Sequence, residues 1–443
     1  MPWQCPVFGP LCDNQEKVRN SQTLSGSADK ALLLWKWFLT ALLAAVILML
    51  AASRDFYDSS MTSAYLSLAI ASALVILLVL RRSWADLLLA MAGGGLLALL
   101  DLRILLFPDR FMAWFSFIGM SSFFMLGLRA VWAEAKDRKM LLCGFVPAAL
   151  FVGSEYMAST LLDITEMLHP KVFDLFLYSF DCSLRMQIAF KLGKLLLMWP
   201  WLREACLLFY LALPLPLALV FAAHLRQGIS RAMPVMLAFL LTGPVGVLFY
   251  NMLPACGPIH LFGAAFPLHP PAIADVMRVK LETVLITHDA RNAIPSLHMA
   301  WVLLVWWCSR GLARWIRAIA FTFLAFTAVA TMGIGEHYFV DVVVAYPFAL
   351  MLLALCSYTL SSSNEKRRAA FLWGTFCTLL WFALLSFVTQ IFWINRALPW
   401  TMVIVTIAGT VILQARLQRA LDSETGDQPA EAVVLPNQVA QEV

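Results

Sequence analysis

The chain has 443 residues, of which 61% are hydrophobic and only 13% are charged. Soluble domains contain about 45–50% apolar and about 25% charged residues, so this composition excludes a soluble protein and predicts a polytopic membrane protein. The formal net charge of +5 is scattered over short loops, so it reflects membrane topology and not nucleic-acid binding.

Apolar runs recur along the chain, each long enough to cross a bilayer core of about 30 Å as a helix. We therefore predict an all-α, polytopic transmembrane bundle of about twelve helices. The predicted spans are 31–52, 61–80, 84–107, 111–132, 139–162, 203–223, 232–252, 296–310, 314–334, 337–357, 369–390 and 399–415.

Composition divides the chain into five parts. We predict a polar cytoplasmic segment at 1–30, an accessory transmembrane bundle at 31–162, a catalytic core at 163–360, appended helices at 361–420 and a disordered tail at 421–443. Within the core, residues 170–201 mix charged side chains with Phe, Leu, Met and Trp. This stretch is predicted either to lie on the membrane interface as an amphipathic helix, over the site, or to link two bundles.

Basic residues concentrate on alternate loops. These are Arg81-Arg82, Lys136 to Lys139, Arg226 with Arg231, Arg310 with Arg314, and Lys366 to Arg368. By the positive-inside rule these loops and both termini are cytoplasmic. The intervening loops, which include the two motifs described next, then face the extracytoplasmic side.

Two short motifs carry the chemistry. The first runs from Arg291 to His298 (RNAIPSLH), and the second from Glu336 to Asp341 (EHYFVD). A predicted helical hairpin between them returns the chain to the same membrane face, so the two histidines can meet there. His337 and Asp341 are four residues apart and share a helix face, where the carboxylate can reach an imidazole N–H. A histidine pair with one member held by a carboxylate suits phosphoryl transfer, whereas either histidine alone would be read as an interfacial residue satisfied by water.

Ser296 and His298 are predicted to begin a membrane helix. Free backbone N–H groups and the helix dipole at such a start favour an anion, so a phosphate is expected there.

The Pro295-Ser296-x-His298 and His337-x-x-x-Asp341 motifs resemble the signatures of the type 2 phosphatidic acid phosphatase superfamily. The resemblance implies a six-helix-type catalytic core in which His337 attacks phosphorus and forms a phosphohistidine. It also implies that Asp341 orients His337, that His298 protonates the leaving group and that Ser296 lies near the phosphate. No metal or other cofactor is implied.

The chain departs from the phosphatase pattern in two places. Thr331 stands where the phosphatases usually have Arg, and no Arg-Pro pair precedes Pro295. The segment His337 to Asp341 is more similar to the inositol phosphorylceramide synthase branch, and Leu253 to Pro258 resembles a stretch of the inositolphosphotransferases. Without the usual Arg, the candidate phosphate-binding cations are Arg291, Lys280 and Arg278, unless they are solvated loop cations.

The sequence contains further polar residues that we do not assign to the catalytic set. His260, His269 and His288 are read as loop residues, since no spacing among them forms a metal set with carboxylates. Glu336 either binds an acceptor hydroxyl, tunes His337, or is a surface acid at a helix start. Glu155 lies inside an apolar run, where it pairs with a neighbouring helix or contacts a lipid headgroup.

We therefore expect an integral membrane enzyme that moves a phospho-headgroup of the inositol-phosphate type to a lipid or polyol acceptor. The donor would be a phospholipid or a polyprenyl phosphate. A lipid phosphate or polyprenyl diphosphate phosphatase is the alternative, since the two differ only in the second acceptor. A lipid transporter with proton-binding histidines is the alternative from another class. The resemblance and the lack of a recognisable sorting signal lead us to expect the bacterial inner membrane.

Overall fold

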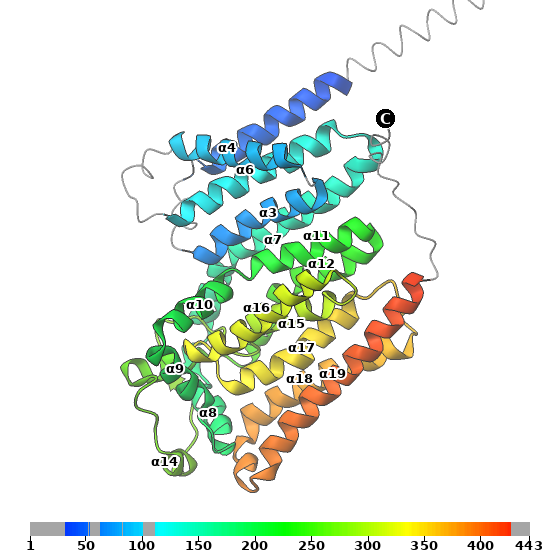
Figure 1. The fold of residues 1–443 in the computed structure, drawn as a ribbon. Coiled ribbons are helices and arrows are strands. Elements are labelled where there is room, and N and C mark those ends of the chain that lie inside the picture. Colours follow the sequence, from blue (N-terminus) through cyan, green and yellow to red (C-terminus); the bar gives the residue numbers. More distant parts are fainter. Residues whose placement is uncertain (1–31, 52, 54–62, 82, 101–110, 427–443) are drawn as a thin grey trace, which may run out of the picture.

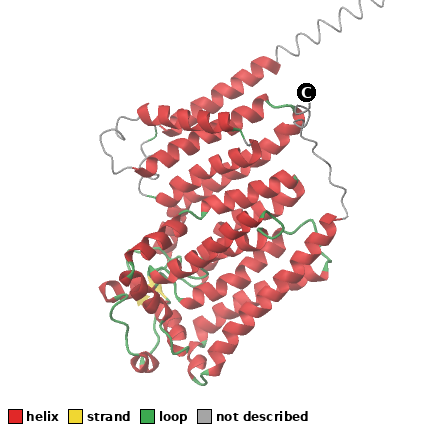
Figure 2. Ribbon diagram, in the orientation of Figure 1, coloured by secondary structure: helices red, strands yellow, loops and turns green. Residues whose placement is uncertain are grey.

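The computed structural model describes residues 32–51, 53, 63–81, 83–100 and 111–426. Helices make up nearly all of its secondary structure, with one small two-stranded sheet (Figures 1 and 2). This confirms the predicted all-α bundle. The predicted segment 1–30 and most of the predicted tail lie outside the described residues.

Five described helices fall in the predicted accessory bundle. They are Leu32–Ala51, α3 (Ala64–Arg81), α4 (Trp84–Leu100), α6 (Phe111–Trp132) and α7 (Ala135–Leu168). The next ten helices fall in the predicted core: α8 (Asp174–Ser183), α9 (Ile188–Met198), α10 (Pro200–Leu211), α11 (Pro214–Gln227), α12 (Ile229–Met252), α13 (Pro258–Phe262), α14 (Ile273–Arg278), α15 (Leu297–Cys308), α16 (Arg314–Gly333) and α17 (Phe339–Cys356). The chain ends with α18 (Glu365–Phe387) and α19 (Ala397–Gly426), and two short 3₁₀ turns lie at Gly263–Ala265 and Thr389–Trp393.

Within the described residues, nine helices are long and apolar enough to cross a membrane. The pair α10 and α11, bent by 46°, makes a tenth candidate, and α4 and α15 are shorter apolar helices. Each predicted apolar segment corresponds to one of these elements.

The helices lie side by side, with the accessory bundle at one flank and α18 and α19 at the other (Figure 1). Helix α3 packs against α6, α7 and α11, and α7 packs against α12, which joins the accessory bundle to the core. Helix α17 is surrounded by α12, α15, α18 and α19. Its sequence is apolar on every side, as expected of a helix that is buried all round.

The stretch between α7 and α10 differs from its prediction. Strand β1 (Lys171–Val172) pairs antiparallel with β2 (Val284–Leu285), and most residues of the following α8 are buried. The predicted interfacial helix is therefore wrong for α8, which packs against α17 and α18. The charged residues that suggested an interface include Asp174 and Asp181, whose seven-residue spacing turns both inward on one helix face.

The last helix is longer than predicted. Helix α19 runs to Gly426, although its span was predicted to end at 415 and a disordered tail to begin at 421. Leu417 and Ala420 are buried, and Gln418 donates to Asp422 one turn later, so packing extends the helix past its apolar run.

Candidate active site

His337 lies in the turn between α16 and α17, and its side chain is buried. It was predicted to share a helix face with Asp341, but it precedes the first residue of α17 by two positions and is not helical. Its Nδ1 is 2.7 Å from the carbonyl oxygen of Ala293 and 3.6 Å from Oδ2 of Asp341. A carbonyl oxygen can only accept, so Nδ1 must carry the proton and donate it. The lone pair of the ring therefore lies on Nε2, which is the atom a nucleophilic histidine would use.

Burial also sets the charge of this ring. It lowers the pKa of His337 from 6.5 to about 4, although the carboxylate of Glu336 and the Ala293 carbonyl act in the opposite direction. A buried imidazole loses water that would stabilise its charged form. His337 is thus neutral at neutral pH, as a nucleophile must be.

Asp341 both holds a helix start and adjoins the histidine. Its Oδ2 accepts from the backbone N–H of Tyr338 at 2.7 Å and so caps the first turn of α17. Its backbone carbonyl accepts from the N–H of Ser296 at 3.3 Å, which joins the two motifs. Oδ1 is buried and has no hydrogen-bond partner among the described residues, so it keeps free acceptor capacity.

The first motif begins α15. Ser296 is its N-cap, and the side-chain oxygen accepts from the N–H of Met299 at 3.4 Å. The ring of His298 stacks on Tyr210 with centroids 3.8 Å apart and meets the edge of Tyr65 at 5.3 Å. Its Nε2 is buried without a hydrogen-bond partner in the described part of the chain.

The two histidine rings lie close enough to interact electrostatically. The structure thus gathers four of the predicted residues, namely His298, His337, Asp341 and Ser296, at one end of α15 and α17. That arrangement fits a nucleophile and an acid on either side of a phosphorus atom.

The three predicted cations are placed differently. Arg291 is fully buried, and its guanidinium donates to the carbonyl oxygens of His169, Ile286 and Asp289 and to Sγ of Cys256. It therefore holds together the loop that leads into α15. Lys280 is 85% exposed and pairs with Glu282, and Arg278 is exposed at the end of α14.

Two buried acids support the site and were missed from the sequence. Asp174 accepts from the backbone N–H groups of Cys256 and Gly257 and from the hydroxyl of Tyr338. Asp181 accepts from the N–H groups of Phe339 and Val340, the free donors at the start of α17. Burial raises the pKa of both acids, and their backbone hydrogen bonds oppose that rise. Their seven-residue spacing was the only signal in the sequence.

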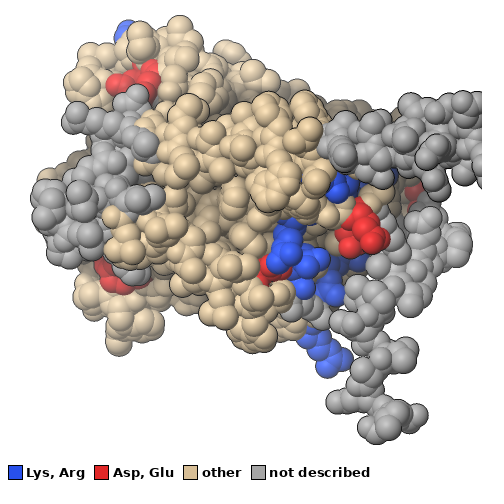
Figure 3. Space-filling model, turned by 90° about the horizontal axis from the view of Figure 1, so that it is seen from above, with Lys and Arg blue, Asp and Glu red and all other residues tan. Residues whose placement is uncertain are grey.

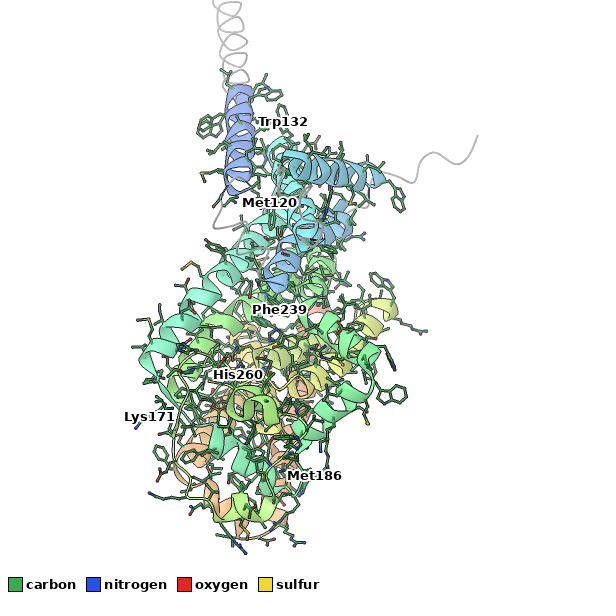
Figure 4. All side chains as sticks on the ribbon, turned by 90° about the vertical axis from the view of Figure 1, so that its left-hand side faces the viewer. Met120, Trp132, Lys171, Met186, Phe239 and His260 are labelled. Carbon is green, nitrogen blue, oxygen red and sulfur yellow. The ribbon has the colours of Figure 1, made fainter. Side chains whose placement is uncertain are left out.

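His260 was read as a loop residue, but it lies in α13 between two carboxylates. Its Nδ1 is 2.7 Å from Oδ1 of Asp289, and its Nε2 is 3.9 Å from Oε2 of Glu336. The carboxylates of Glu336 and Asp289 raise the pKa of His260 above 6.5. His260 thus connects the loop before the first motif with the residue that precedes His337. In Figure 4, which looks at the molecule from the left-hand side of Figure 1, His260 lies near the middle of the view, in the same region as Lys171 of β1.

Among the described residues, no group of three or more His, Cys, Asp or Glu side chains is arranged to hold a metal ion. Cys5 and Cys12, a cysteine pair near the start of the sequence that could contribute two metal ligands, lie outside the described residues.

Residues 175–355 match the family model of the PAP2 superfamily. The matched segment runs from α8 to α17 and contains both histidine motifs. PAP2 similarity supports a phosphatase- or phosphotransferase-type function for this part of the chain. It does not select the inositol phosphorylceramide synthase branch, which stays a prediction. No curated protein and no solved structure matches the chain.

Proposed function

We propose that the chain catalyses phosphoryl transfer between membrane lipids through a phosphohistidine at His337. Nε2 of His337 attacks phosphorus, and the bond from phosphorus to the lipid oxygen breaks. The negative charge of the bound phosphate favours the protonated form of His298, which gives its proton to that oxygen, so the oxygen leaves as an alcohol. Asp341 stabilises the positive charge that develops on the His337 ring as the N–P bond forms.

The second half of the reaction restores the enzyme. An acceptor hydroxyl gives its proton to His298 and attacks phosphorus, and the N–P bond to His337 breaks. A lipid or polyol acceptor makes the enzyme a transferase of a phospho-headgroup of the inositol-phosphate type. Water as the acceptor makes it a lipid phosphate or polyprenyl diphosphate phosphatase.

The observation that carries the proposal is the contact between Nδ1 of His337 and the Ala293 carbonyl, since it leaves Nε2 of His337 unprotonated. The ring of His298, whose Nε2 has no hydrogen-bond partner among the described residues, lies within electrostatic reach of His337. Transfer is favoured over hydrolysis because Thr331 occupies the position of the usual phosphatase Arg. Thr331 is buried in α16, and its carbonyl accepts from the N–H of His337.

We propose that the site faces the extracytoplasmic side. Helix α15 starts at the site and ends at the turn that carries Arg310 and Arg314, so these cations lie at the opposite end of the bundle. Most of the Lys and Arg side chains visible in Figure 3 also gather toward one end. Both observations support a cytoplasmic position for the basic loops. The bacterial inner membrane remains our prediction for location.

The test uses the purified full-length chain in detergent with a phospholipid labelled in its phospho-headgroup and a set of acceptor lipids. Label that moves to an acceptor, and is lost in His337→Gln and His298→Gln, supports a transferase. Release of the labelled headgroup phosphate to water with the same dependence supports a phosphatase. His269→Gln, which changes an exposed histidine, serves as the control. Movement of intact lipid that survives His337→Gln would favour a transporter and contradict the proposal.

A further inference from the structure

Residues of the accessory bundle contact the candidate acid. Tyr65, in the first turn of α3, meets the His298 ring edge-on at 5.3 Å and stacks over Trp301 at 6.3 Å. Phe151 of α7 meets the same Trp301 edge-on at 6.3 Å. One face of α15, which carries His298 and Trp301 three residues apart, therefore packs against both α3 and α7.

The directions of α7 and α15 bring a further residue to this place. The carbonyl of His169, just after α7, accepts from Arg291, just before α15, so the two helices run antiparallel. Glu155 follows Phe151 by one turn, and His298 precedes Trp301 by almost one turn, so both lie toward the same end. Glu155 and Tyr210 are also within electrostatic reach of the Tyr65 hydroxyl. Tyr65, Glu155, Tyr210 and His298 thus form one cluster, which we call the tyrosine–glutamate cluster.

This cluster holds polar atoms without partners. The hydroxyl of Tyr65 and Nε2 of His298 are both buried with no hydrogen-bond partner among the residues that the structure describes. Buried polar atoms are nearly always hydrogen-bonded in proteins, so such atoms in a site point to a molecule that completes them. Glu155 is an acid within a membrane helix, where an ionisable residue usually serves a function.

We propose that Tyr65 and Glu155 bind the leaving group, the lipid alcohol that departs when the bond from phosphorus to oxygen breaks. The inference rests on the proposed function, in which His298 protonates that alcohol. The departing oxygen must lie beside Nε2 of His298, so the atoms next to it in the lipid lie beside Tyr65 and Glu155. The accessory bundle is then part of the active site, and Tyr210, stacked on His298, is a positioning residue.

The chemistry of the cluster selects a class of lipid. A phenol hydroxyl and a carboxyl group can donate to and accept from the ester and hydroxyl groups of a glycerol backbone. A polyprenol offers no polar atom beyond its terminal oxygen, so it would leave the same groups unpaired. A site built to hydrogen-bond a polar group discriminates against an analogue that lacks it. The donor is therefore a glycerolipid, and its leaving group is a diacylglycerol.

Direct binding of the leaving group separates this inference from the proposed function. We would measure equilibrium binding of labelled dioctanoylglycerol and of geraniol to the full-length chain in detergent. Tyr65→Phe and Glu155→Leu should each weaken dioctanoylglycerol binding about tenfold, the loss of one hydrogen bond, and leave geraniol binding unchanged. Glu155→Gln, which keeps a donor and an acceptor, should retain most of the affinity.

The matched controls are Tyr358→Phe and Asp163→Asn, which alter exposed residues away from the cluster. Equal melting temperatures for Tyr65→Phe and Tyr358→Phe show that the fold is intact. The inference would be overturned if wild-type protein failed to bind dioctanoylglycerol. It would also be overturned if Tyr65→Phe and Glu155→Leu kept the wild-type affinity for both alcohols, or lost affinity for both alcohols to the same extent. His337→Gln should still bind dioctanoylglycerol, so the proposed function can fail while this site stands.

Discussion

The carbonyl oxygen of Ala293 lies 2.7 Å from Nδ1 of His337. This contact joins the two motifs across the bundle and fixes which ring nitrogen carries the proton. Since the carbonyl can only accept, Nε2 is left free for attack, and the ring cannot turn without losing a buried hydrogen bond. The backbone of the first motif thus orients the nucleophile of the second.

The low pKa of His337 should appear in the stability of the protein. The folded state holds this histidine neutral down to about pH 4, whereas an unfolded chain takes up a proton near pH 6.5. The unfolded state therefore binds more protons in this window, and the free energy of unfolding falls as pH falls from 6.5 towards 4. Melting temperatures of wild type should drop more steeply over that window than those of His337→Gln. Parallel curves would contradict the burial of a neutral imidazole.

His260 should show the opposite dependence. Its folded pKa is raised by Glu336 and Asp289, so its stabilising contribution is full below pH 6.5 and is lost as pH rises through the folded pKa. His260→Gln should therefore lower the melting temperature at about pH 6 and change it little at about pH 9. The matched control is His269→Gln, and an equal loss at both values of pH would show that the ion pairs do not contribute.

Gly257 is required where the loop after α12 meets the turn before His337. Its φ is +117°, and a Cβ there would collide with the carbonyl oxygen of Glu336. Gly257→Ala should lower the free energy of unfolding by about 2 kcal/mol or more, through strain and overlap together. Gly311 has a φ of +81° and open space, so Gly311→Ala measures the strain alone. Equal losses in the two variants would mean that the contact with Glu336 does not matter.

Arg291 should matter for stability more than the exposed cations do. Its buried guanidinium donates hydrogen bonds to three backbone carbonyl oxygens and to one sulfur atom. Arg291→Met therefore leaves these buried acceptors without their donor. We expect a loss of about 3 kcal/mol in chemical denaturation, against no measurable change for Lys280→Met. A fully stable Arg291→Met that binds phosphate-bearing lipid poorly would instead return Arg291 to the role predicted from the sequence.

The fold and the two motifs were predictable because their signals are local. An apolar run specifies a membrane helix without reference to its neighbours, and each motif is a short run of adjacent residues. The shared helix face predicted for His337 and Asp341 is wrong, because α17 begins only at Phe339, although Nδ1 of His337 still lies 3.6 Å from Oδ2 of Asp341. The remainder depends on long-range partners. Asp174 meets Tyr338 and Gly257, and His260 meets Glu336 and Asp289, through contacts that no local pattern encodes. The sequence does not show that the guanidinium of Arg291 donates to backbone carbonyls, so Arg291 was predicted to be free to bind phosphate.

The most direct test of the account is to trap the phosphohistidine. The full-length chain is mixed with a phospholipid labelled in its phospho-headgroup, without an added acceptor, and quenched in alkali. We expect acid-labile label on the peptide that contains His337, absent from His337→Gln and retained in His269→Gln. Turnover with no labelled protein, or label that persists in His337→Gln, would contradict His337 as the nucleophile.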